Sequence, residues 1–125
     1  MTNHAMGARM WIVPDCYLPV QSTGGLESHE AACVLNLGAK AAELKFTAFF
    51  EDRGPLEDLR ATCGPRRTNH VHLEALKNRR GESIPRGVPF ALAVESNFQV
   101  VVQHTRLDTT QPALALMTTM AFPVR

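Results

Sequence analysis

Glycine and proline recur along the whole chain and leave only short apolar runs between them, which limits the fold more than any other feature. Eight glycines and eight prolines are spread over 125 residues. Both residues interrupt long helices, whereas both are frequent in the turns that join short strands. The spacing of glycine and proline predicts an all-β fold, an antiparallel β-sandwich of jelly-roll type. At most one short helix is expected, over Leu73 to Asn78. A partly closed barrel is the alternative.

Two segments show the alternation of apolar and polar residues that is typical of half-buried strands. In the segment 44–50, one face carries Leu44, Phe46, Ala48 and Phe50. In the segment 29–37, one face carries Ala31, Cys33, Leu35 and Leu37. A turn is expected directly after the first of these segments, over Glu51 to Pro55.

Further strands are expected nearer the end of the chain. Val100 to Val102 is a β-branched triplet, which is typical of a strand that is buried on both faces. Ser96-Asn97 before it reads as a tight turn, so Phe90 to Val94 and the triplet are expected to form a hairpin. Terminal strands are expected at Trp11 to Val13 and Met117 to Phe122.

Composition and charge exclude several broad classes of protein. Hydrophobic residues make up 45% and charged residues 20%, as in an ordinary globular domain, so residues 1–125 are expected to form one domain, with residues 1–9 flexible. The formal net charge is +1, which encodes no overall attraction to nucleic acid or acidic lipid. The three cysteines show no CxxC spacing, which favours reduced thiols in a cytoplasmic protein. Neither a membrane-spanning run nor a secretory signal is expected.

The densest polar string is Gln103 to Asp108, directly after the valine triplet. Strand periodicity places His104, Arg106 and Asp108 on one face and Gln103 on the other. Such a face forms either an anion-binding surface or an ion-paired ladder. In the second case Arg106 pairs with Asp108, and His104 caps the pair in an interface between subunits.

Two other strings contain histidine but match no complete catalytic or metal motif. In Ser28-His29-Glu30, strand geometry directs His29 away from its two neighbours, which excludes a hydrolytic triad. His70 and His72 share a strand face, as metal sites require, and their spacing from Gly64 resembles half of a cupin motif. The remaining cupin ligands are missing. We therefore predict no catalytic residue, no metal ligand and no cofactor, with a metal-dependent cupin-like enzyme as the least favoured alternative.

Five cations form a modest basic cluster in the middle of the chain. A cluster of this kind can contact nucleic acid phosphates with a salt-dependent affinity. Neither interleaved aromatic residues nor a helix-turn-helix pattern accompanies it, so solvated loop charge is the simpler interpretation. DNA therefore stays a weakly supported partner. The cluster consists of Arg66, Arg67, Lys77, Arg79 and Arg80.

Several strings together resemble the soluble sensory rhodopsin transducer family. The most specific is Val100 to Asp108, with the sequence VVVQHTRLD. The others are Ser28 to Glu30, Leu35 to Gly38, Pro65 to Val71 and Ser96-Asn97. The resemblance extends from about Trp11 to Phe122, which is nearly the whole chain.

The resemblance implies a jelly-roll β-sandwich that assembles into a homotetramer and has a signalling role without a known reaction. Its implied partners are a membrane photoreceptor or another regulatory protein, contacted without insertion into the membrane. A module that binds a sugar or another small polar metabolite is the alternative. The positions implied to bind a ligand or partner are His29, Glu30, Asn36, Arg67, His70, Asn97, Gln103, His104, Arg106 and Asp108.

Overall fold

The computed structural model describes residues 6–125, and within that range the chain is an all-β sandwich. The first strand, β1, begins at Ala8, so residues 8 and 9 of the segment 1–9, which was expected to be flexible, belong to a strand. Residues 1–5 of that segment lie outside the described part. One 3-10 turn, η1 (Leu73–Ala75), occupies part of the expected helix. The strands are β1 (Ala8–Cys16), β2 (His29–Asn36), β3 (Ala42–Phe50), β4 (Leu56–Cys63), β5 (Arg67–His72), β6 (Phe90–Asp108), β7 (Ala115–Met120) and β8 (Phe122–Val124).

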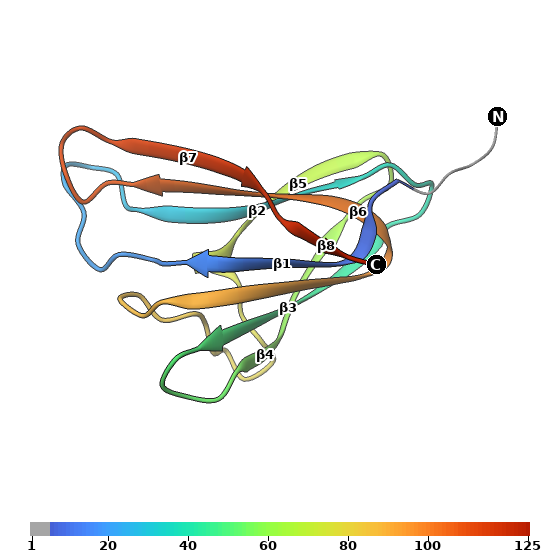
Figure 1. Cartoon of the computed structure of the whole chain (residues 1–125), viewed down its shortest axis with the longest axis horizontal. Coiled ribbons are helices and arrows are strands. Elements are labelled where there is room, and N and C mark those ends of the chain that lie inside the picture. The colour runs from blue at the N-terminus through green and yellow to red at the C-terminus, as the bar shows by residue number, and fades with distance from the viewer. Residues whose placement is uncertain (1–5) are drawn as a thin grey trace.

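The strands form two layers that share one long strand, as Figure 1 shows. In the first layer the order is β4, β3, β6, β1, β8. In the second layer β2 lies between β5 and β6, and β7 is the outer neighbour of β6. Every one of these pairings is antiparallel. The antiparallel β-sandwich expected from the sequence is therefore confirmed.

The hairpin expected around Ser96-Asn97 is wrong. Strand β6 continues through this point for 19 residues and bends, so that its two halves lie in different layers (Figure 1). The first half pairs with β1 and β3, and the second half pairs with β2 and β7. The register with β1 shifts at the bend, from Met10 opposite Glu95 to Ala8 opposite Val100. Extra residues accommodated in this way bend a strand without ending it.

The core lies between the two layers and follows the alternation of the strands. In β3, Leu44, Phe46 and Ala48 are fully buried, as their spacing predicts. In the valine triplet, Val100 and Val102 are buried, and Val101 between them is half-buried and packs against the core. Among the described residues, no helix has the length and apolar character needed to cross a bilayer.

Strand β2 buries the face that carries its polar residues. Glu30, Ala32, Val34 and Asn36 are all fully buried, whereas Leu35 on the other face is 38% exposed. The period-2 pattern of apolar residues in this segment therefore marks the outer face and not the core. The consequence is that a carboxylate and an amide lie in the interior and require partners there.

Candidate functional site

The most polar part of the interior is centred on the Glu30 side chain. One carboxylate oxygen, Oε1, lies 2.7 Å from His104 Nε2. The other, Oε2, accepts hydrogen bonds from the Tyr17 backbone N–H at 2.7 Å and from Arg106 Nε at 2.8 Å. We call Glu30, His104, Arg106 and the Tyr17 amide the Glu30 network. The register of β2 with β6 creates it, because Ala32 lies opposite His104 and Glu30 lies opposite Arg106.

The Glu30 network joins the two layers of the sandwich. Tyr17 follows directly after β1 in the first layer, whereas β2 and the second half of β6 belong to the other layer. Arg106 extends the link, since its Nη2 donates to the Asp15 carbonyl at 3.2 Å and lies 3.7 Å from the Asp15 carboxylate. Breaking a buried ion pair by removing one partner strongly destabilises a protein. The network therefore acts as a structural clamp.

Cys16 lies next to this network and completes a set of potential metal ligands. One ligand atom each of Cys16, Glu30 and His104 lies within 4.8 Å of the others, and all three residues are buried. Burial and the nearby charge of Glu30 raise the pKa of the Cys16 thiol far above its usual value, which favours the neutral thiol. Both Glu30 oxygens already accept hydrogen bonds from protein donors. The set is thus better suited to holding the fold than to binding a metal ion or attacking a substrate.

The ladder expected within β6 forms differently. His104 and Arg106 do share a face, but Arg106 pairs with Glu30 and Asp15 and not with Asp108. Asp108 accepts hydrogen bonds from the Thr110 hydroxyl at 2.6 Å and the Thr110 backbone N–H at 2.8 Å, which lower the pKa of its carboxyl. His104 is 1% exposed within a single chain, so the expectation that it caps an ion pair between subunits is also wrong.

Two more of the implied residues hydrogen-bond to backbone groups, Asn36 at the end of β2 and Asn97 at the bend of β6. Asn36 is fully buried; its Oδ1 accepts from the Gly38 N–H, and its Nδ2 lies within hydrogen-bond distance of three carbonyl oxygens, those of Lys40, Cys63 and Gly64. Asn97 accepts a hydrogen bond from the Glu43 backbone N–H at 2.8 Å. These contacts satisfy backbone groups at the ends of strands. Both side chains are engaged by their own chain.

The other implied residues lie toward solvent on the outer face or at the edge of the second layer. His70 lies opposite Cys33 and is exposed, and Gln103 donates to Thr118 Oγ1 at 2.7 Å. Arg67 lies opposite Asn36 and contacts two neighbouring carbonyl groups. Six strand positions separate Asn36 from Glu30, about 20 Å at 3.3 Å per residue. The implied residues therefore do not converge on one pocket.

His29 also faces outward, and it adjoins two residues that the sequence interpretation did not assign to the site. Its ring centroid lies 5.1 Å from that of His72. His72 Nδ1 in turn lies 2.9 Å from a Glu74 carboxylate oxygen. The signal for this grouping is weak in the sequence, because His29 and His72 lie on different strands and only the register of β2 with β5 brings them together.

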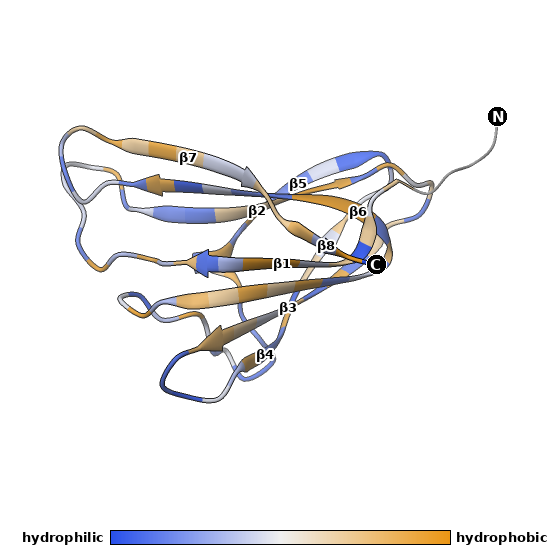
Figure 2. Cartoon of the chain, viewed as in Figure 1, coloured by the Kyte–Doolittle hydropathy of each residue, from blue (hydrophilic) through white to orange (hydrophobic). Residues whose placement is uncertain are grey.

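The last two strands carry a group of exposed apolar side chains. All six residues of β7 are exposed, and β7 is an edge strand that pairs only with β6 among the described elements. Figure 2 shows hydrophobic colouring on both β7 and β8. We call this surface the β7–β8 strip. Its large apolar side chains are Leu116, Met117, Met120, Phe122 and Val124, and Leu114 lies directly before β7.

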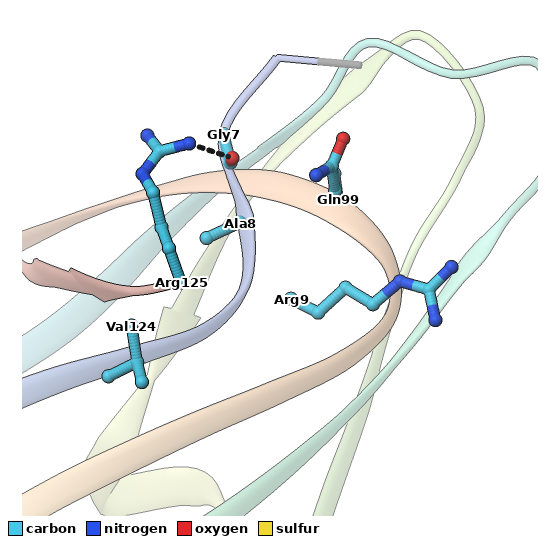
Figure 3. Close-up of a pocket in the computed structure, with 6 residues that line it drawn as sticks. All are labelled: Gly7, Ala8, Arg9, Gln99, Val124 and Arg125. Carbon is cyan, nitrogen blue, oxygen red and sulfur yellow. Dashed lines mark hydrogen bonds between the residues drawn. The ribbon is translucent and has the colours of Figure 1, made fainter.

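A shallow pocket lies where the start of β1 meets the end of the chain (Figure 3). Arg125 Nη1 donates to the Gly7 carbonyl at 3.2 Å across it. Gly7 has a φ of +93°, and a Cβ there would lie 2.0 Å from the Val100 carbonyl oxygen, so only glycine fits. None of the residues implied by the sequence lines this pocket, whose lining is Gly7, Ala8, Arg9, Gln99, Val124 and Arg125.

Comparison with known proteins covers nearly the whole chain. Residues 6–123 match the family model described as Anabaena sensory rhodopsin transducer. The crystal structure of Thermotoga maritima 1070 is similar, with 34% identity and a TM-score of 0.84 over 95% of this chain and 97% of that chain. The Anabaena sensory rhodopsin transducer itself matches with 35% identity and a TM-score of 0.74 over 84% and 92% of the two chains. Comparison with curated protein sequences gives no significant match.

Proposed function

Because the chain belongs to the Anabaena sensory rhodopsin transducer family, we propose that it is a non-enzymatic cytoplasmic signalling adaptor that works as a homotetramer. The observation that carries this proposal is the family match over residues 6–123. The Glu30 network supports it, because the side chains most suited to chemistry are already bound to one another. A membrane photoreceptor or another regulatory protein is the partner that such an adaptor contacts.

The β7–β8 strip supports self-association. Leu116 is 72% exposed and Phe122 is 66% exposed, in a stretch from Thr109 to Val124 that contains no charged residue. Edge strands of soluble proteins are usually protected by charge, by proline or by a covering element. An uncharged apolar edge is therefore suited to burial against a neighbouring copy. The net charge of +1 adds little repulsion between copies.

Light scattering coupled to gel filtration tests the oligomeric state. We expect a mass of about four times the 13.8 kDa of the chain. The Met120→Glu variant should dissociate, because it places a charge in the strip that the proposed tetramer buries. Leu26→Glu is the matched control, since Leu26 is 54% exposed but lies outside the strip, and it should remain tetrameric. A monomeric wild-type chain contradicts the homotetramer, and a tetrameric Met120→Glu variant removes the strip from the interface.

Binding to a membrane photoreceptor tests the adaptor role. The full chain is passed over a sensory rhodopsin from the same cells in lipid nanodiscs, in the dark and under illumination. We expect saturable binding whose affinity changes with light, because a signalling adaptor must distinguish the two receptor states. Binding that is equal in both states contradicts transduction from that receptor. If the rhodopsin does not bind and cross-linking in the native cells recovers no regulatory protein, the adaptor role is contradicted.

A carbohydrate-binding module has less support. The side chains suited to sugar recognition lie at separate places: His104 and Arg106 are held in the Glu30 network, and Asn97 is engaged at the bend of β6. Sugar sites also commonly use an exposed aromatic ring for stacking. Trp11, the single tryptophan, is 4% exposed, and its Nε1 donates to the Val100 carbonyl at 3.0 Å.

A further inference from the structure

Two histidines from different strands lie side by side on the outer face of the second layer. His72 is the last residue of β5 and lies opposite Ala31 of β2. His29 is two positions away from Ala31, so it projects from the same face and lies diagonally across from His72. The two ring centroids are 5.1 Å apart, and the ring planes are inclined by 44°. The grouping thus arises from strand register and not from a local motif.

The spacing of the rings fits two imidazoles that bind one ion. Zinc–nitrogen bonds are about 2.0–2.1 Å long, and structural zinc is tetrahedral. In that geometry, two coordinated imidazole rings have centroids about 5 Å apart. The His72 side chain is 49% exposed, which leaves room for water molecules to complete the coordination. The observed separation of the ring centroids, 5.1 Å, is therefore close to the separation of two imidazoles that share one metal ion.

Glu74 contacts the His72 ring through Nδ1 and leaves Nε2 as the nitrogen that can bind a metal ion. Its Oε2 lies 2.9 Å from His72 Nδ1, so the Nδ1 hydrogen donates to the carboxylate and the Nε2 lone pair is directed elsewhere. The other carboxylate oxygen accepts from the Glu30 backbone N–H at 3.4 Å, which ties Glu74 to the start of β2. Metal-binding histidines commonly have their second nitrogen bonded to a carboxylate in this way, which fixes the tautomer.

We propose that His29 and His72 bind one divalent transition-metal ion, of the Zn²⁺, Ni²⁺ or Cu²⁺ type, and that Glu74 positions His72. Imidazole nitrogen suits these ions, and the order of affinity should place Cu²⁺ first. The site is separate from the Glu30 network, because His29 and Glu30 project from opposite faces of β2. His70, which the sequence paired with His72, lies two residues earlier on β5, opposite Cys33, and is not needed.

Isothermal titration of the full, metal-free chain with Zn²⁺, Ni²⁺ and Cu²⁺ tests the site. We expect one ion per chain, and a loss of affinity of about 100-fold or more when either ligand is removed, in His29→Asn or His72→Asn. The matched control is His70→Asn, an exposed histidine on the same face, which should bind as the wild type does. Binding should weaken between pH 7.5 and pH 5.5, because protons compete for the same nitrogens.

The positioning role of Glu74 has its own readout. Glu74→Gln should weaken metal binding by about 10-fold or more, as is usual for a lost carboxylate behind a ligand. Nitrogen-resolved NMR of the imidazoles should show His72 as the Nδ1-H tautomer in the wild type and a mixture in Glu74→Gln. A fixed tautomer with unchanged affinity in Glu74→Gln contradicts the positioning role.

Two further variants separate this site from other metal-binding groups in the chain. Cys16→Ala removes a ligand from the buried Cys16, Glu30 and His104 set, and His4→Asn removes the histidine outside the described residues. Both should keep wild-type affinity, and Co²⁺ should give no thiolate charge-transfer band. The proposal is overturned if no ion binds, or if either variant or His70→Asn loses affinity as much as His72→Asn does.

Discussion

Glu30 and His29 are neighbours in the sequence and differ in almost every physical respect. Glu30 is 0% exposed, and both of its oxygens accept hydrogen bonds inside the protein. His29 lies on the outer face, where it meets His72 and solvent. One step along a strand thus separates a group that holds the fold from a group open to a ligand. A run of polar residues in the sequence therefore does not show which side chains are available to bind a ligand.

The largest effect is expected from breaking the Glu30 network. Arg106→Ala should lower the free energy of unfolding by about 3 kcal/mol, because it leaves a buried carboxylate without its cation. Urea unfolding followed by circular dichroism measures this change. Arg60→Ala is the matched control, since the Arg60–Asp58 pair is 61% exposed on both sides and should cost less than about 1 kcal/mol. Equal effects of the two substitutions contradict the assignment of Arg106 as a clamp.

At His29 on the outer face, binding of a metal ion should change the free energy of unfolding, whereas substitution of the side chain without metal should not. Without metal, His29→Ala should alter the free energy of unfolding by less than about 0.5 kcal/mol, as is usual for surface positions. With free Zn²⁺ at 100 times its Kd, the wild type should gain about 2.7 kcal/mol and His29→Ala should gain little. Thermal unfolding at matched metal concentrations provides the comparison. A similar gain in both proteins would place the ion elsewhere.

The other end of the inner face of β2 provides a second comparison within the same strand. Asn36→Ala should cost about 2 kcal/mol, because it leaves buried carbonyls such as that of Cys63 without a donor. Leu35→Ala changes the neighbouring outward position and should cost less than about 1 kcal/mol. Urea unfolding of both variants tests the order. A larger cost for Leu35→Ala in the isolated chain would reverse the assignment of inner and outer faces.

The smallest effect is expected at Asp108, which faces solvent at the end of β6. Thr110 lowers the pKa of this carboxyl, so the folded state favours the charged form. The stabilisation is therefore present above the unfolded-state pKa and is lost as the pH falls through the folded-state pKa. The stability difference between the wild type and Asp108→Ala should shrink between about pH 5 and pH 2. A difference that grows on acidification contradicts this cause.

Local pattern predicted several strands, missed β4, merged β7 and β8 into one expected strand, and predicted one connection badly. The alternation in residues 44–50 identified the buried face of β3, and the shared face of His104 and Arg106 follows from strand periodicity. Ser96-Asn97 was expected to be a turn, but it lies within β6. The sequence did not show this, because the bend depends on contacts with distant residues. One such contact joins Trp11 Nε1 to the Val100 carbonyl across 89 positions of sequence.

The candidate site was predicted in its residues but not in its grouping. Glu30, His104 and Arg106 were all named from the sequence, yet their mutual contacts join positions 74 and 76 residues apart. His72 and Glu74 were absent from the expected set, because the partner that makes them noteworthy, His29, lies on another strand. The exposure of the β7–β8 strip was not foreseen either, since an apolar strand reads as buried when its neighbours are unknown.

The amino-acid sequence by itself determined the class of fold and which side chains share a face, because glycine, proline and the two-residue period of a strand act locally. It did not determine which face is covered. In β2 the outer face carries Leu35 while the inner face carries Glu30 and Asn36, and only the sandwich provides the donors that make this arrangement stable. Tertiary structure decided the pairing of strands, because register is set by contacts between segments far apart in the chain.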